Sequence, residues 1–186
     1  MRIDPTAIPV RDMYRMMIGV ITPRPIAWVS TISPNGVPNL APFSFFNGVA
    51  ANPPAIMFCP VNRRDGSKKD TVLNIEQTPE FVVNVVSFGQ AAPMNACSEE
   101  FAYEVSEFEK CGLTPLPSEK IKPPRVKEAQ VHLECVLHQI VHVGDGPLAA
   151  NLVIGRIVLM HVDDTVLGPD GLPDPRKLDT IGRMGG

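Results

Sequence analysis

Residues 25–41, with the sequence PIAWVSTISPNGVPNLA, contain two apolar segments separated by a turn. The first segment, residues 25–32, is rich in the β-branched residues that favour strands. Ser33, Pro34, Asn35 and Gly36 are typical turn residues, and residues 37–41 can run back as a partner strand. This stretch therefore predicts an antiparallel hairpin.

Further strands are expected at residues 55–59, 80–86, 129–143 and 151–162. The last two are expected to pair across the turn at residues 144–147. Residues 129–143 alternate, and the apolar face is expected to hold Val131, Leu133, Cys135, Leu137, Val141 and Val143. Six or seven strands in hairpins predict a closed or nearly closed antiparallel barrel, because closure removes exposed strand edges.

The remaining segments are predicted to be short helices and loops. We expect a helical turn at residues 14–18, a helix capped by Asp70 and ended by Thr78-Pro79, and a helix at residues 90–97. Ser106 and Glu109 form a capping-box pattern that opens another short helix. Residues 42–54 are expected to form a loop, and the proline-rich residues 113–125 an ordered surface loop.

The composition favours one β-rich domain over residues 1–186, with 44% hydrophobic residues and a net charge of −3. The 20 prolines, about 11% of the chain against a usual ~5%, disfavour long helices. No basic stripe or long apolar run is present, so neither nucleic acid nor membrane is an expected partner. Four separated cysteines and charged residues near the start predict a cytoplasmic protein with reduced thiols.

The histidines do not predict a metal site. His132, His138 and His142 span ten residues of one expected strand, roughly 33 Å when extended, so they cannot bind one ion. His161 lies near a strand end, where it could line the mouth of a site or be an ordinary strand-end histidine.

Two segments carry candidate binding chemistry, and neither a Rossmann nor a P-loop motif is present. Residues 39–47, NLAPFSFFN, could hold a flat heteroaromatic ring or could simply plug one end of the barrel. Residues 63–71, RRDGSKKDT, precede a helix start and could hold a phosphate or form a solvated basic loop. Together they describe a site for a mononucleotide with a flat, largely apolar ring.

At these residues the sequence resembles the flavin reductase-like, FMN-binding split-barrel family, in the branch of flavoredoxin and the reductase components of two-component monooxygenases. The resemblance runs through TPRPIAWVST (22–31), NLAPFSFFNGVAANPP (39–54), SKKDTVLNI (67–75), EFVVNVV (80–86) and VIGRIVLMHVDD (153–164). It covers nearly the whole chain. It implies a mainly β fold, a six-stranded antiparallel split barrel with Greek-key character and a few short flanking helices.

The resemblance also implies a homodimer with one FMN, or possibly FAD, in each cleft between the subunits. It places Asn47 as a support of the ring-binding loop, Trp28 beside the flavin or its ribityl chain, and Arg24 across the dimer. The residues implied to contact the isoalloxazine are Ala41, Pro42, Phe43, Ser44, Phe45 and Phe46. Those implied at the phosphate are Lys68, Asp70 and Thr71, with Ser67 and Lys69 as helpers.

The implied activity is that of a flavin reductase that transfers hydride from NADH or NADPH to flavin N5. His161 is then a candidate for orienting the nicotinamide or a proton, and a monooxygenase or another redox protein is the expected partner. Two alternatives stay open. One is an FMN electron carrier reduced by a partner protein, as in flavoredoxin, and the other is a non-catalytic flavin-binding dimer.

Overall fold

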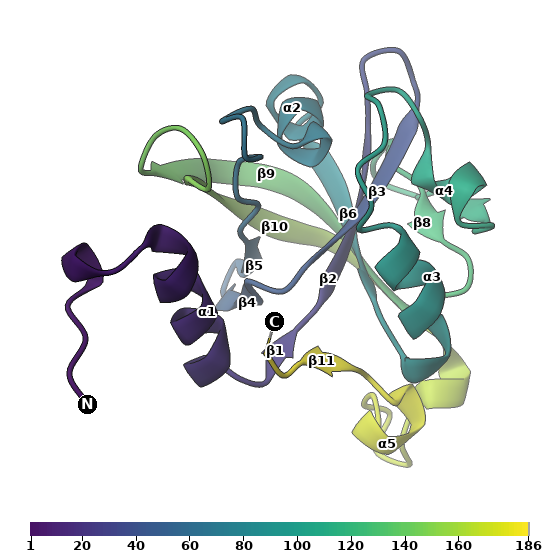
Figure 1. Cartoon of the computed structure of the whole chain (residues 1–186). Coiled ribbons are helices and arrows are strands. Elements are labelled where there is room, and N and C mark those ends of the chain that lie inside the picture. Colours follow the sequence, from purple (N-terminus) through teal and green to yellow (C-terminus); the bar gives the residue numbers. More distant parts are fainter. Residues whose placement is uncertain (186) are drawn as a thin grey trace.

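The computed structural model describes residues 1–185 and is built around one antiparallel sheet of seven strands (Figure 1). Along the sheet the strands follow the order β3-β2-β6-β9-β10-β5-β4. Their bounds are β2 (Ala27–Ile32), β3 (Pro38–Phe43), β4 (Phe46–Ala51), β5 (Pro54–Phe58), β6 (Glu80–Val85), β9 (Val131–Val143) and β10 (Ala150–Val162). Every neighbouring pair is antiparallel. The expected mainly β, nearly closed barrel is thereby confirmed.

The barrel stays open between β3 and β4. These strands form the two edges of the sheet, although only Ser44 and Phe45 separate them in the chain. The sequence analysis placed residues 42–54 in a loop, which is wrong, because β4 pairs with β5 over most of this segment. The additional strand raises the count from six to seven.

The expected hairpins at residues 25–41 and 129–162 are confirmed. In the second hairpin the predicted alternation fails beyond Leu137. Leu137 pairs with Gly155 and Gln139 pairs with Ile154. His138, between them, has no partner on β10 and forms a β-bulge. After this bulge Ile140 packs against the core instead of Val141, and Val143 is 60% exposed.

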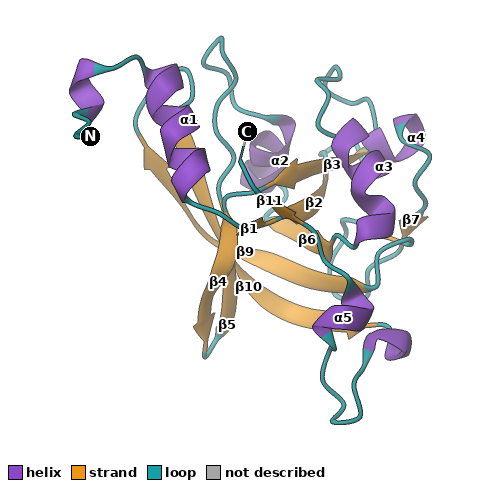
Figure 2. Ribbon diagram, turned by 60° about the horizontal axis from the view of Figure 1, so that its bottom comes forward, coloured by secondary structure: helices purple, strands orange, loops and turns teal. Residues whose placement is uncertain are grey.

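The helices are short and flank the sheet (Figure 2). The N-terminal helix is longer than the single turn expected at residues 14–18. The helical elements are η1 (Pro5–Ala7), α1 (Val10–Val20), α2 (Asp70–Gln77), η2 (Phe88–Gln90), α3 (Ala91–Ala96), α4 (Glu107–Lys110), η3 (Asp164–Val166) and α5 (Pro175–Leu178). Within residues 1–185 no helix has the length and apolar character needed to cross a membrane.

The N-terminal caps of α2 and α4 differ from those predicted from the sequence. Lys69 is the N-cap of α2, and Asp70 is its first helical residue. The Ser106 hydroxyl is buried without a hydrogen-bond partner, so the expected capping box is absent from α4. A capping box forms instead between Ser87 and Gln90.

Short strand pairs tie the remaining segments to the barrel. β1 (Arg24–Pro25) pairs with β11 (Gly182–Arg183). In the proline-rich segment, β7 (Pro115–Leu116) pairs with β8 (Arg125–Val126), so this segment is ordered, as predicted.

The sheet has a packed core on each face. Val29, Phe58 and Phe81 belong to the cluster inside the barrel. Trp28, which neighbours Val29 on β2 and so points to the other face, belongs to a second cluster beneath α3 and α4.

Candidate functional site

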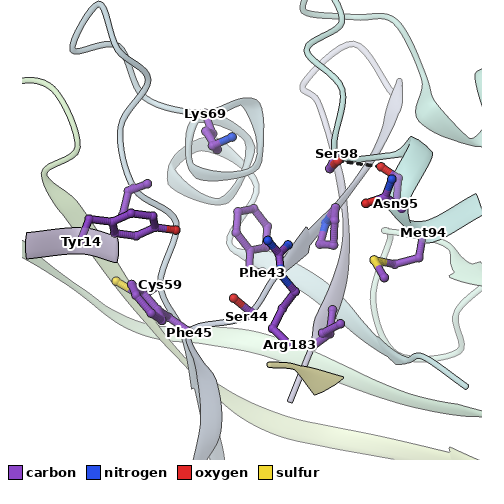
Figure 3. Close-up of a pocket in the computed structure, with 13 residues that line it drawn as sticks. Tyr14, Phe43, Ser44, Phe45, Cys59, Lys69, Met94, Asn95, Ser98 and Arg183 are labelled. Carbon is purple, nitrogen blue, oxygen red and sulfur yellow. Dashed lines mark hydrogen bonds between the residues drawn. The ribbon is translucent and has the colours of Figure 1, made fainter. Parts of the chain in front are cut away.

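A cavity of about 350 Å³ lies beside the β3–β4 loop (Figure 3). Its walls come from segments far apart in the chain, including α1, the β3–β4 loop, the start of α2, α3 and β11. The lining residues are Tyr14, Ile26, Pro42, Phe43, Ser44, Phe45, Cys59, Val61, Lys69, Met94, Asn95, Ser98 and Arg183. None of them is acidic, and Lys69 and Arg183 are cations, so the cavity is suited to an anionic ligand.

A smaller cavity of about 70 Å³ adjoins the first. The two share Pro42, Phe43, Lys69 and Ser98. The smaller one is also lined by Ala41, Asp70 and Thr71, among others. The structure thus brings the ring-binding and phosphate-binding segments of the sequence analysis to one continuous site.

The side chain of Arg24 contacts both residues of the β3–β4 loop, Ser44 and Phe45. Its guanidinium donates to the carbonyl oxygens of Ile18, at 2.7 Å, and Ile21, at 2.5 Å, and its Nε lies 3.4 Å from Ser44 Oγ. The guanidinium carbon also lies 5.9 Å from the centre of the Phe45 ring. Arg24 is buried and bonds within its own chain, and its contact across a dimer stays a prediction.

The phosphate-binding segment is arranged around the start of α2. The first N–H groups of a helix have no partner within it and carry its positive end, so they can receive an anion. Asn39 donates to Thr71 Oγ1 at 3.1 Å, which fixes the hydroxyl in the first turn. Arg63 forms an ion pair with Asp70 at 2.8 Å and so compensates one of the four carboxylates that line the smaller cavity, the others being Glu99, Glu100 and Glu107.

Lys68 and Ser67 line neither of the two cavities. Lys68 Nζ forms an ion pair with Glu76, and Ser67 donates through its backbone N–H and its hydroxyl to Asp65. Lys69, expected only as a helper, lines both cavities, whereas Lys68 lines neither, and the phosphate contacts of both lysines stay predictions.

Three other candidates from the flavin-binding segments lie outside these cavities. Trp28 is fully buried in the core cluster beneath α3 and lines neither cavity, and its place beside a flavin stays a prediction. Phe46 lies on β4 and lines a separate cavity with Arg24. Asn47 is exposed, and its side chain accepts from the Gly48 N–H at 2.8 Å, so it does not support the loop.

His161 also lies outside both cavities. Its Nε2 lies 2.7 Å from Oε1 of Glu134, a fully buried carboxylate that also accepts from the N–H groups of Glu119 and Lys120. Although burial opposes the charge, these hydrogen bonds lower the pKa of Glu134. His161 thus bonds the carboxylate that binds the proline-rich segment, and its role toward a nicotinamide or a proton stays a prediction.

The sequence analysis missed several lining residues. The lining residues of the first cavity that it did not name are Tyr14, Ile26, Cys59, Val61, Met94, Asn95, Ser98 and Arg183. Tyr14 lies edge-on to Phe45, with ring centres 6.5 Å apart. These residues carry no motif and become neighbours only through the tertiary fold.

The chain is similar to known proteins in sequence and in fold. Residues 19–181 match the family model of the flavin reductase like domain. The fold is similar to that of nitrilotriacetate monooxygenase component B from Bacillus cereus, with a TM-score of 0.94 and 39% identity, covering 100% of this chain and 92% of that one.

Two further crystal structures are similar. One is a 2-nitrobenzoate 2-nitroreductase from Pseudomonas fluorescens, with a TM-score of 0.86 and 31% identity over 100% of this chain and 89% of that one. The other is a flavin reductase with a split-barrel domain from Shewanella frigidimarina, with a TM-score of 0.82 and 27% identity over 97% of this chain and 89% of that one.

Proposed function

Because this chain belongs to the flavin reductase-like family, we propose that it is an FMN-binding oxidoreductase and, more specifically, an NAD(P)H-dependent flavin reductase. One observation carries the proposal. The aromatic loop at Phe43–Phe45 and the start of α2 line one continuous site, although they are separated by more than 20 residues of chain.

The residues present fit a flavin mononucleotide. Phe43 and Phe45 provide apolar surface for a flat ring, and Ser44 provides a hydroxyl beside them. Lys69, Thr71 and the first N–H groups of α2 provide cationic and hydrogen-bonding groups for a phosphate. The larger cavity, about 350 Å³, is within the ~300–1,000 Å³ typical of small-molecule sites.

The flavin, when bound, supplies the redox chemistry by accepting a hydride from the nicotinamide nucleotide. The protein's part is then to bind and orient. Ser44, fixed from behind by Arg24, orients the ring, and Lys69 holds the phosphate. Arg183, on the wall formed by β11, provides the second cation for the anionic part of the nucleotide donor. Tyr14 and Met94 shield the ring from water.

We also propose that the chain acts as a homodimer, with the flavin between the subunits, and passes electrons to a monooxygenase or a similar redox protein. The cavity is lined by Tyr14 of α1, a helix whose apolar residues are largely exposed in one subunit. The similarity to a monooxygenase component B supports a redox partner.

The first test is an anaerobic absorption spectrum of the purified protein with FMN, before and after addition of NADH or NADPH. We expect flavin bands that bleach within the mixing time or shortly after it. Bands that persist with either nucleotide and bleach only with dithionite would contradict a reductase and favour an electron carrier. Failure to bind FMN or FAD would contradict the flavin site itself.

The two neighbouring lysines provide a matched test of the phosphate site. Loss of a charge-assisted contact costs about 1.5–3 kcal/mol, so Lys69→Ala is expected to weaken FMN binding by roughly ten- to hundredfold. Lys68→Ala removes the same charge from the next residue and is expected to leave the affinity nearly unchanged, because Lys68 is paired with Glu76. Equal losses in the two variants, measured by fluorescence titration of FMN, would contradict the assignment.

A further inference from the structure

The smaller cavity has one buried acidic residue to which the proposed function gives no role. This residue is Glu107, the first residue of α4, a helix that packs beside β3 (Figure 1). Glu107 is only 6% exposed. Carboxylates are almost never buried to this extent unless hydrogen-bond donors or a cation replace the lost water, so the partners of this side chain decide what it can do.

The protein supplies one donor to the Glu107 carboxylate. The Leu40 N–H, on the edge strand β3, donates to Oε2 at 2.8 Å. The other oxygen, Oε1, accepts from no other residue in the described part of the chain, and Glu107 forms no ion pair there. Within residues 1–185 the sealed side-chain atoms without a partner are Trp28 Nε1 and Ser106 Oγ, so Oε1 is not sealed. It is open to the smaller cavity and can accept a hydrogen bond from a ligand.

The chemistry of Glu107 selects one part of a flavin mononucleotide. Burial raises the pKa of Glu107, and the Leu40 N–H opposes this shift by stabilising the charged form, as a second donor would. The phosphate is an anion and would be repelled by this carboxylate. The isoalloxazine is assigned to the larger cavity, against Phe43 and Phe45. The ribityl chain remains, and its hydroxyl groups are donors that a carboxylate accepts.

The position of the smaller cavity agrees with this selection. The two cavities meet at four residues that line both of them, Pro42, Phe43, Lys69 and Ser98. A chain that joins a ring in the larger cavity to a phosphate at the start of α2 passes this junction. At about 70 Å³, the smaller cavity is well below the ~300–1,000 Å³ of a whole ligand site, so it accommodates only part of a ligand.

We propose that Glu107 binds the ribityl chain of the flavin by accepting a hydrogen bond from one of its hydroxyl groups at Oε1. Glu107 is then a specificity-determining residue for flavins that carry a hydroxylated chain. This inference rests on the proposed function, because it uses the same two cavities. It adds a residue from outside the segments that carry the family resemblance, since none of them includes residues 106–110.

Three flavins with the same ring separate the contacts of the site. Lumiflavin has a methyl group in place of the chain, riboflavin has the hydroxylated chain without a phosphate, and FMN has both. We expect the wild type to bind riboflavin at least tenfold more tightly than lumiflavin, measured by fluorescence titration. This comparison needs no variant, and equal affinities for the two flavins would overturn the proposal.

Glu107→Gln tests the carboxylate itself. The Gln side-chain oxygen can still accept from the Leu40 N–H, but a bond between the amide and a ligand hydroxyl is neutral and about half as strong as a charge-assisted one. We expect riboflavin affinity to fall about tenfold and lumiflavin affinity to stay unchanged. Glu107→Met, which has no such acceptor, should lose at least as much riboflavin affinity. Circular dichroism checks that each variant is folded.

Glu100→Gln is the matched control. Glu100 lines the same cavity but is exposed, so removing its charge should leave the affinities for riboflavin and lumiflavin nearly unchanged. If this control lost as much riboflavin affinity as Glu107→Gln, the effect would belong to the charge of the cavity and the proposal would be overturned.

The remaining outcomes distinguish the role of Glu107 from the proposed function. A Glu107→Gln variant that loses affinity for FMN but not for riboflavin would show that Glu107 acts on the phosphate. Equal losses for riboflavin and lumiflavin would show that it only supports the fold of the site. Either result overturns the proposal, as does a variant with unchanged affinities, and none of these results affects the flavin site itself. A wild type that binds none of the three flavins would overturn the proposed function together with this role.

Discussion

At the scale of single residues, His132 is expected to make the free energy of unfolding depend on pH. It is buried, and its Nδ1 lies 3.0 Å from Oδ1 of Asn84, which also accepts from the Val126 N–H. Burial, with help from the charge of Arg125 and from His161, lowers the pKa of His132 to about 4. The neutral imidazole is therefore the form that the fold accommodates.

This depressed pKa predicts acid destabilisation in a defined window. An unfolded histidine has a pKa near 6.5, so between about pH 4 and 6.5 the unfolded chain binds more protons than the folded one. The free energy of unfolding should be unaffected by His132 above pH 6.5 and should fall by roughly 3 kcal/mol as the pH approaches 4. Urea unfolding of the wild type and His132→Gln at pH 7 and 4.5 tests this. Equal pH dependence in both proteins would contradict it.

Glu134 affects the free energy of unfolding in a lower pH range than His132 does. Its pKa is depressed, so its contribution to stability is present above its unfolded value, near 4.3, and is lost as the pH falls below that value. Glu134→Gln removes the charge that the N–H groups of Glu119 and Lys120 and the His161 ring share. We expect it to lower the free energy of unfolding at pH 7 by about 1.5–3 kcal/mol, measured by urea unfolding. A loss below about 0.5 kcal/mol would contradict a structural role for the carboxylate.

The limits of sequence reasoning at this scale are shown by Lys68 and Lys69. Both are lysines in the same polar segment, and the sequence places them equally near the helix start. The difference arises from Glu76, two turns along α2. Glu76 forms an ion pair with Lys68, whereas Lys69 lines the site. The segment was predictable from residue types, but the side chain directions depend on its partners in three dimensions.

At the scale of elements, the approach of β10 to β6 depends on Gly155. A Cβ added there would overlap the Phe81 ring, at 2.7 Å from Cε1. Gly155→Ala should therefore destabilise the protein by about 1–3 kcal/mol through overpacking, measured by urea unfolding. Gly48→Ala, on a strand where a Cβ would meet nothing within 4 Å, is the control. Combining Gly155→Ala with Phe81→Leu should cost less than the sum of the two, and strict additivity would argue against the clash.

The strands themselves were predictable where most of their residues are buried. β2, β5 and β6 have apolar segments and were predicted within a few residues. β4 was missed because its residues are mostly exposed and do not alternate, so its position depends on pairing with β5. The bulge at His138 was also missed. The apolar and polar residues continue to alternate in the sequence past this point, whereas the bulge turns the side chains that follow it to the opposite face of the strand.

At the scale of the whole molecule, α1 is covered on one side only. Ile18 is its single buried residue, whereas Val10 is 69% and Val20 81% exposed. Arg24 bonds to the carbonyl oxygens of Ile18 and Ile21, and Tyr14 contacts Phe45, so the helix is fixed beside the candidate site. We predict that this exposed apolar face contacts a second copy of the chain, which would close the site.

The dimer is tested by multi-angle light scattering after gel filtration. A subunit has a mass of 20.2 kDa, and we expect a species of twice that mass. Val20→Glu introduces a charge on the exposed face of α1 and should give a monomer that binds FMN at least tenfold more weakly, because half of each site would be lost. Leu172→Glu is the matched control, since Leu172 is 63% exposed on the loop before α5, away from α1 (Figures 1 and 2). A wild-type monomer with full FMN affinity would contradict both the dimer and the shared site, whereas a Val20→Glu dimer would place the interface elsewhere on the barrel.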